Sequence, residues 1–325
     1  KKVVVTFPHM GNVFLIAKVL FENFGVEYVI PPFNNKRTLE IGTKHSPEMV
    51  CLPFKINMGN YIQAIEAGAD TIMMLGGVGP CRFGYYWVLQ KEILEDMGYK
   101  ADVVALELPN GDMAGFLERI RKITGGCGLL SILKALMEAY KVSIMADNLE
   151  SLTFKTRPRE KDKGATDNIY SDFLIKALTA GGGQEIMKMI RETIRRLERI
   201  EVDRECQPLK IGIVGEIYTV IEPFVNFFIE RKLGNMGVEV NRSLYISGWI
   251  REHLLKEVFK FGRKNDFRKA AEPYLGAAIG GHALETVGNA VLYSRGDFDG
   301  IIQVYPLTCM PEIVAGSLLP SVNRC

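Results

Sequence analysis

Residues 1–29, KKVVVTFPHMGNVFLIAKVLFENFGVEYV, contain the pattern that decides the fold: an apolar stretch, a turn, a segment of helical periodicity and a second apolar stretch. The pattern returns at residues 209–240, LKIGIVGEIYTVIEPFVNFFIERKLGNMGVEV, and each copy reaches its second apolar stretch through Gly-Val-Glu. Strands that alternate with helices in this way form parallel sheets covered by helices. The sequence therefore predicts an α/β protein with two related halves.

The likeness between the halves extends to a third strand in each. Asp70 and Cys81 flank one apolar run, and Asp299 and Cys309 flank another at almost the same spacing. Each half is therefore expected to carry a thiol at the same strand end. In the first half, the periodicity predicts strands at 3–7, 27–30, 70–75 and 102–108, and helices at 12–24, 57–68, 84–97 and 112–122.

Residues 125–207 separate the two halves and lack strand signals. Two stretches within them, SILKALMEAYKV and EIMKMIRETIRRLERI, repeat apolar residues every three or four positions, which predicts helices. Between these, KTRPREKDKGATDN at 155–168 is expected to form a solvated surface loop. The predicted domains are an N-terminal α/β domain at 1–124, a helical connection at 125–207 and a C-terminal α/β domain at 208–325.

The composition excludes several classes of function. The 40 basic residues nearly balance the 38 acidic ones, so the chain lacks the basic excess that favours nucleic-acid binding. No apolar run is long enough to span a bilayer and no secretory signal is evident, so we expect a cytoplasmic protein without a membrane segment. P-loop, G-x-G-x-x-G and H-E-x-x-H motifs are absent, so neither an ATP site nor an NAD site is expected in this chain.

The six cysteines carry the strongest signal for chemistry. They are too few for a disulfide framework in a chain of this length, so reduced thiols or metal ligands are the better interpretations. Three lie beside proline in loops: Cys51 in CLPF, Cys81 in GPC and Cys309 in CMP. No C-x-x-C pair occurs, so three thiols from separate loops suit a cluster held between domains. Soft thiolates select iron–sulfur clusters, zinc or cuprous copper, whereas the alternative is that each cysteine is a small core residue.

Other reactive side chains lie near the expected carboxyl ends of the strands, where open parallel sheets bind ligands. His9 and Glu216 occupy the turns after the first strand of each half. His282 and Glu285, in GGHALET, stand at the start of a predicted helix. Backbone N–H groups there suit a phosphate or a thioester oxygen, and simple helix capping is the alternative. These four residues are the candidates for catalysis.

The loop around Cys81 is rich in glycine. Gly77 and Gly79 would allow backbone N–H groups to approach a cluster sulfide or an anion, although a plain tight turn explains them as well. Cys127, in TGGCGLL, is a candidate for a fourth thiol.

Five motifs together resemble the 2-hydroxyacyl-CoA dehydratase and benzoyl-CoA reductase superfamily: CLPFKINMGN, GGVGPCRFGYY, GEIYTVIEPFVNFFIERKL, GGHALET and YPLTCMPE. The resemblance covers nearly the whole chain and is strongest to the branch of activase-related, or CoA-substrate-specific activase-associated, proteins. It implies two Rossmann-like α/β domains joined by helices. It also implies a [4Fe-4S] cluster at the domain interface, with Cys51, Cys81 and Cys309 as its ligands. Double-cubane relatives need more cysteines than these three, so that cluster type is not expected.

The resemblance also implies a partner and a type of reaction. The partner is a separate ATP-hydrolysing activase with its own iron–sulfur cluster, which supplies one low-potential electron. In the dehydratases this electron converts an acyl-CoA thioester into a ketyl radical anion that expels a hydroxyl group, and the reductases use such electrons for other reductions. Pairing of two such chains, as a homodimer or a heterodimer, is also expected.

Three classes of function stay open at this point. The chain is an enzyme acting on an acyl-CoA or similar thioester, or a cluster-bearing electron-transfer or accessory subunit without a small-molecule substrate. The third class is a zinc-binding or metal-free structural protein. The cysteine pattern alone fits both of the first two classes.

Overall fold

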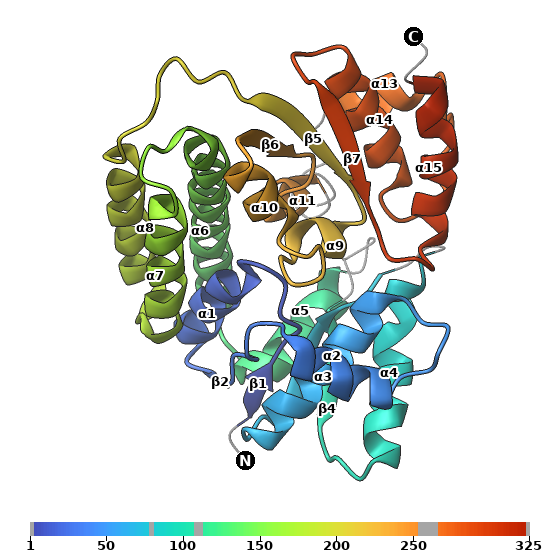
Figure 1. Ribbon diagram of the computed structural model, residues 1–325. Helices are drawn as coiled ribbons and strands as arrows, with labels where there is room; N and C mark the ends of the chain where they lie inside the picture. Colours follow the sequence, from blue (N-terminus) through green and yellow to red (C-terminus); the bar gives the residue numbers. More distant parts are fainter. Residues whose placement is uncertain (1–2, 78–80, 107–112, 253–265, 323–325) are drawn as a thin grey trace. The chain divides into compact units, whose positions relative to one another are not determined.

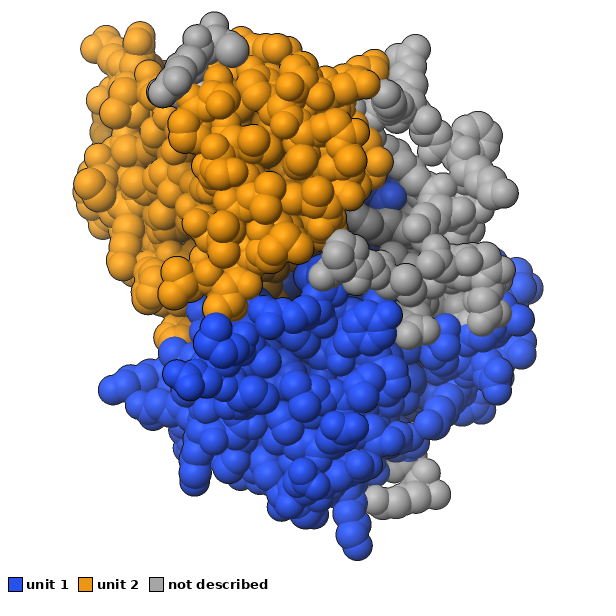
Figure 2. Space-filling view, turned by 90° about the vertical axis from the view of Figure 1, so that its right-hand side faces the viewer, with its two compact units in different colours: residues 1–141, 249–261 blue, residues 142–248, 262–325 orange. Residues whose placement is uncertain are grey.

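A computed structural model describes residues 3–77, 81–106, 113–252 and 266–322 of the chain (Figure 1). The chain divides into two compact units, each with its own parallel sheet. Unit 1 comprises residues 1–141 and 249–261, and unit 2 comprises residues 142–248 and 262–325, as the colours of Figure 2 show. The protein is therefore of the α/β class. Within the described part of the chain, every helix is too short or too polar to cross a lipid bilayer.

Unit 1 is built on four parallel strands in the order β2-β1-β3-β4. The strands are β1 (Val4–Thr6), β2 (Glu27–Tyr28), β3 (Thr71–Leu75) and β4 (Asp102–Leu106). Its helices are α1 (Val13–Phe24), α2 (Lys36–Lys44), α3 (Leu52–Glu66), the short η1 (Arg82–Tyr85), α4 (Tyr86–Asp96) and α5 (Met113–Thr124). Apolar side chains of α3, β3 and α4 form one buried cluster, which includes Phe54, Met58, Ile72, Met74 and Leu94. This cluster fixes the start of α3 and the start of α4 against the same sheet.

Unit 2 is built on three parallel strands in the order β6-β5-β7. The strands are β5 (Leu209–Gly215), β6 (Val238–Arg242) and β7 (Gly300–Val304). The long helix α6 (Leu129–Thr156) belongs to unit 2 from residue 142 onward. The remaining elements are η2 (Arg157–Arg159), α7 (Ala165–Thr179), α8 (Gly182–Glu198), α9 (Ile217–Ile221), α10 (Ile229–Asn235), α11 (Ile246–Ile250), α13 (Asp266–Ala271), α14 (Ala283–Ser294) and α15 (Met310–Val322). Helix α11 begins in unit 2, and its last two residues belong to unit 1.

The two sheets confirm the predicted likeness between the halves. The order β2-β1-β3 in unit 1 corresponds to β6-β5-β7 in unit 2, with the first strand of each half in the middle. The two aspartates also play the same part: the backbone N–H of Val4 donates to Oδ1 of Asp70 at 2.9 Å, and that of Lys210 donates to Oδ2 of Asp299 at 2.7 Å. Each aspartate therefore fastens the third strand of its half to the beginning of the central strand.

A glycine stands before the second strand in both halves. Gly25, with φ of 65°, and Gly237, with φ of 85°, adopt the left-handed conformation that a side chain disfavours. The N–H of Gly25 donates to the carbonyl oxygen of Glu22 at 3.1 Å, which closes the end of α1. In both halves the repeated Gly-Val-Glu therefore marks where a helix ends and the next strand begins.

Two helices of unit 1 differ from the prediction. The helix expected at 57–68 begins earlier, at Leu52, because Pro53 lies in its first turn, where a missing N–H costs little. Helix α2 was not predicted, because its nine residues contain few apolar side chains. It packs closely on α3 at a glycine: a Cβ on Gly59 would lie 2.0 Å from the carbonyl oxygen of Thr38. Helix α2 is therefore held against α3 by a close backbone contact, and it does not need a wide apolar face.

The prediction of a solvated loop at 155–168 is wrong for much of that segment. Arg157 and Glu160 are buried, and the two carboxylate oxygens of Glu160 accept hydrogen bonds from backbone N–H groups at the start of α7, at 2.7 and 2.8 Å. Nε of Arg157 donates to Oδ1 of Asp167 at 2.8 Å. The charges of Arg157, Glu160 and Asp167 are therefore satisfied inside unit 2, whereas residues 161–163 are exposed as predicted.

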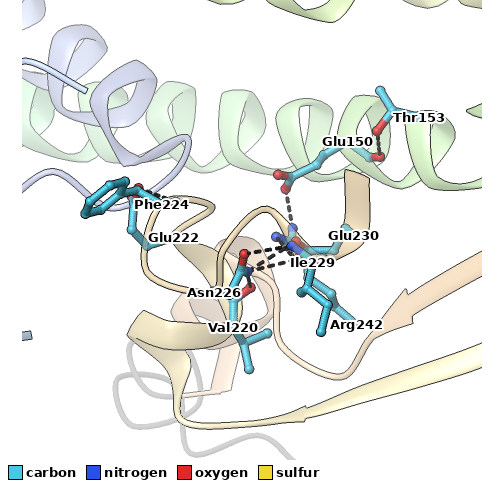
Figure 3. A network of polar contacts seen from close by, with 9 residues as sticks. All are labelled: Glu150, Thr153, Val220, Glu222, Phe224, Asn226, Ile229, Glu230 and Arg242. Carbon is cyan, nitrogen blue, oxygen red and sulfur yellow. Dashed lines mark hydrogen bonds and ion pairs between the residues drawn. The ribbon is translucent and has the colours of Figure 1, made fainter. Parts of the chain in front are cut away.

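A buried arginine ties three elements of unit 2 together (Figure 3). Arg242, at the end of β6, forms an ion pair with Glu150 of α6 and a second one with Glu230 of α10, where Nη1 and Oε1 are 3.6 Å apart. Its guanidinium also lies over the rings of Phe154 and Tyr245. Because buried charges need partners, this arginine fixes α6 and α10 beside the sheet.

Candidate functional site

The three cysteines in proline-containing loops all stand immediately before a helix. Cys51 is the N-cap residue of α3 and Cys81 that of η1, while the carbonyl oxygen of Cys309 accepts the N–H of Ile313 in the first turn of α15 at 3.0 Å. All three are half-buried, and none forms a disulfide with another described cysteine. The backbone N–H groups of a helix N-terminus stabilise negative charge placed beside them.

The structure brings the Cys51 and Cys81 loops of unit 1 together. Sγ of Cys51 lies 2.6 Å from the hydroxyl oxygen of Tyr86, which stands five residues after Cys81. Nη1 of Arg82 also donates to the carbonyl oxygen of Met49 at 3.4 Å. Cys309 belongs to unit 2, where it follows β7 as predicted. Among the described residues, no three His, Cys, Asp or Glu side chains are grouped as a metal site.

Tyr86 contacts Cys51 from a buried and well-packed position. Its ring packs edge-on against Phe54, with ring centres 4.9 Å apart, and also against Phe83. Burial raises the pKa of the Tyr86 hydroxyl far above its usual range, and the nearby Cys51 adds to this, so the hydroxyl keeps its proton at neutral pH. Tyr86 was not among the residues predicted from the sequence, although it ends the motif GGVGPCRFGYY that contains Cys81.

Glycine closes the Cys81 loop through a backbone contact. A Cβ on Gly84 would lie 2.1 Å from the carbonyl oxygen of Gly77, so only glycine fits at position 84. The N–H of Gly76 donates to the carbonyl oxygen of Leu106 at the end of β4, at 3.0 Å. Close packing therefore requires glycine at position 84, whereas a Cβ on Gly77 would meet only the Cα of Gly84, at 3.9 Å. Gly79 lies outside the described residues.

His9 is surrounded by aromatic rings and a closed set of hydrogen bonds. Its ring stacks on Phe14 and meets Phe33 edge-on, at centre distances of 5.9 and 5.0 Å. The backbone N–H of His9 donates to Asn60, Asn60 donates to Asn34, and Asn34 donates to the carbonyl oxygen of His9, at 2.9 to 3.2 Å. Burial lowers the pKa of His9 to about 4, so the imidazole is neutral at pH 7. These contacts fix the turn after β1.

Glu216 occupies the corresponding turn in unit 2 and caps α9. Its carboxylate accepts the backbone N–H groups of Tyr218 and Thr219, both at 2.9 Å, and the Thr219 hydroxyl at 2.9 Å. Burial raises the pKa of Glu216, although these hydrogen bonds partly offset that effect. The residue predicted after β5 is therefore a half-buried helix cap.

The residues from GGHALET lie at the first turn of α14. His282 is its N-cap residue, and its carbonyl oxygen accepts the N–H of Thr286 at 2.8 Å. Glu285 is in the same turn. A Cβ on Gly281 would lie 3.0 Å from Pro311, so this loop packs directly on the start of α15. The starts of α14 and α15, and thus the neighbourhoods of His282 and Cys309, adjoin within unit 2.

Glu312, which sequence reasoning missed, is buried where these elements meet. Its carboxylate accepts the hydroxyl of Thr286 at 3.0 Å and Nε2 of Gln303 at 2.9 Å. Burial raises its pKa to about 7; these hydrogen bonds lower it, and the negative charges of Glu216 and Glu285 add to the rise. Glu312 thus changes its protonation state near neutral pH, and its place three residues after Cys309 was the available signal.

Cys127 lies apart from these groups. Its Sγ donates to the carbonyl oxygens of Thr124 and Phe24, at 3.6 and 3.9 Å. The thiol thus fastens the end of α5 to the end of α1 within unit 1.

No protein-family model matches the chain, and no curated protein matches its sequence.

Proposed function

We propose that this protein is the iron–sulfur component of an ATP-activated electron-transfer system that acts on an acyl-CoA or similar substrate through one-electron reduction. The observation that carries the proposal is the placement of three thiols, each directly before a helix and two of them after the third strand of equivalent half-folds. The resemblance of the five motifs to the dehydratase and reductase superfamily supplies the chemistry. In this proposal the chain holds one [4Fe-4S] cluster.

The residues fit such a cluster by the chemistry of their donor atoms. Cys51, Cys81 and Cys309 would hold it, and half-buried thiols before helices suit thiolate ligands. When bound, a [4Fe-4S] cluster with three protein thiolates exchanges one electron at low potential and leaves one iron position for a further ligand. The contact of Gly84 with Gly77 would keep the Cys81 thiol at a fixed place in unit 1.

The chain's own residues also supply a group for proton transfer. Glu312 gains and loses a proton near pH 7, and its hydrogen bonds to Thr286 and Gln303 hold it in one orientation. A general acid or base works best when its pKa lies near the working pH. Glu312 therefore joins His282 and Glu285 as a proposed acid–base group, whereas the contacts of His9 and Glu216 are those of structural residues.

The first test is the iron and acid-labile sulfide content of the anaerobically reconstituted protein, together with its EPR spectrum after reduction. We expect about four irons per chain in the wild type, as a [4Fe-4S] cluster requires, and loss or alteration of the signal in Cys81→Ser. The matched control is Cys206→Ser, since Cys206 is also half-buried but stands at no helix start. Folded wild-type protein that stays free of iron would refute the proposal.

A second test separates the enzyme from an electron-transfer subunit. The protein is mixed with CoA thioesters, an ATP-hydrolysing activase and a low-potential electron donor. A thioester that changes the EPR spectrum and is consumed supports an enzyme. A reduced cluster that no thioester affects identifies an accessory electron-transfer subunit, which is the alternative function.

A further inference from the structure

The contact between Tyr86 and Cys51 joins a residue with no assigned role to one of the three thiols. Sγ of Cys51 and the hydroxyl oxygen of Tyr86 are 2.6 Å apart, although 35 positions separate the residues. A cysteine that binds iron is a thiolate without a proton. A sulfur without a proton can only accept, so the Tyr86 O–H is then the donor and the Cys51 sulfur the acceptor.

The position of the Tyr86 hydroxyl is set by packing. Only 5% of Tyr86 is exposed, and its ring is wedged against Phe54 of α3 and Phe83 of η1. Phe54 is itself three residues after Cys51, so the helix that presents the thiol also seats the ring. Tyr85, the preceding residue, is 62% exposed and has the same hydroxyl. The chain thus offers a matched control for the loss of a tyrosine hydroxyl.

A hydrogen bond to a cluster sulfur stabilises negative charge, and the reduced cluster carries one more negative charge than the oxidised one. Such hydrogen bonds are one of the factors that set the reduction potentials of iron–sulfur clusters. We propose that Tyr86 is a positioning residue whose hydroxyl donates to the Cys51 sulfur and raises the reduction potential of the cluster. The inference rests on the proposed function. In the step concerned, one electron enters from the activase-type donor, no bond forms or breaks, and Tyr86 retains its proton.

The decisive measurement is the midpoint potential of the reconstituted cluster, followed by EPR, in wild type, Tyr86→Phe and Tyr85→Phe. Phenylalanine keeps the ring of residue 86 and removes only its hydroxyl. We expect a lower midpoint potential in Tyr86→Phe, by up to ~59 mV. This shift corresponds to about a tenfold change in the equilibrium constant for one-electron reduction. Tyr85→Phe should match the wild type. A fully loaded Tyr86→Phe cluster with wild-type potential would overturn the inference and leave the proposed function standing.

A second readout does not require the cluster. In the reduced, iron-free protein, the infrared S–H stretching band of Cys51 is assigned by its loss in Cys51→Ser. We expect this band to shift in Tyr86→Phe and to stay unchanged in Tyr85→Phe, since only the first variant removes the contact. An unshifted band would overturn the hydrogen bond itself. Failure of the proposed function alone would instead show as wild-type protein that binds no iron although the band responds.

Discussion

Replacing Glu312 by glutamine is expected to change how the stability of the protein depends on pH. Burial raises the pKa of this carboxyl from an ordinary value of 4.5 to about 7. A pKa that is higher in the folded state means that the folded protein binds the proton more tightly than the unfolded chain does. The associated stability is fully present below about pH 4.5 and is lost as the pH rises through about 7. Two to three pKa units correspond to about 3 kcal/mol of unfolding free energy.

The assay is urea unfolding of wild type and Glu312→Gln at pH 5 and pH 8. Glutamine keeps the size of the side chain and can still bond to Thr286, but it never carries a charge. The stability of the variant relative to wild type should therefore rise by about 2 to 3 kcal/mol between the two pH values. Glu205→Gln, an exposed carboxyl in unit 2, is the control for removing one negative charge. A difference between variant and wild type that does not change with pH would refute the reasoning.

Two further predictions concern packing. Gly84→Ala places a Cβ 2.1 Å from the carbonyl oxygen of Gly77, so it should destabilise unit 1 by about 1 to 3 kcal/mol in urea unfolding. Gly128→Ala, with open space around its Cβ, should be nearly neutral in the same assay. Arg242→Ala leaves two buried carboxylates without their arginine and should lower the free energy of unfolding by about 3 to 5 kcal/mol. Lys36→Ala, at an exposed ion pair, should lower it by less than about 1 kcal/mol. Equal losses of stability for the two variants in thermal or urea unfolding would contradict this account.

Much of the fold could be predicted because its signals are local. The apolar run, turn and helical segment of residues 1–29 are contiguous, and so is their copy at 209–240. The prediction that the halves are related is confirmed by the order of the strands and by the equal use of Asp70 and Asp299. The start of α3 was mistaken because proline is also a loop former, and only its place in a first turn makes it compatible with a helix.

The candidate site was predicted in part for the same reason. A cysteine beside proline and glycine at the end of an apolar run is visible in sequence, and Cys51, Cys81 and Cys309 do stand at helix starts. Whether a buried polar residue is catalytic or structural is not local information. His9 and Glu216 were chosen for their position after a strand, and only their contacts show that one is packed between rings and the other caps a helix.

The sequence by itself determined the α/β class, the two related halves and the loops that carry the thiols, since period, turn residues and spacing are properties of neighbouring residues. Only the tertiary structure decided which side chains share an environment. Cys51 meets Tyr86 across 35 positions, Glu312 meets Thr286 across 26, and Arg242 meets Glu150 across 92. The energies of such pairs depend on burial and on distance in space, and the order of residues along the chain reveals neither of these directly.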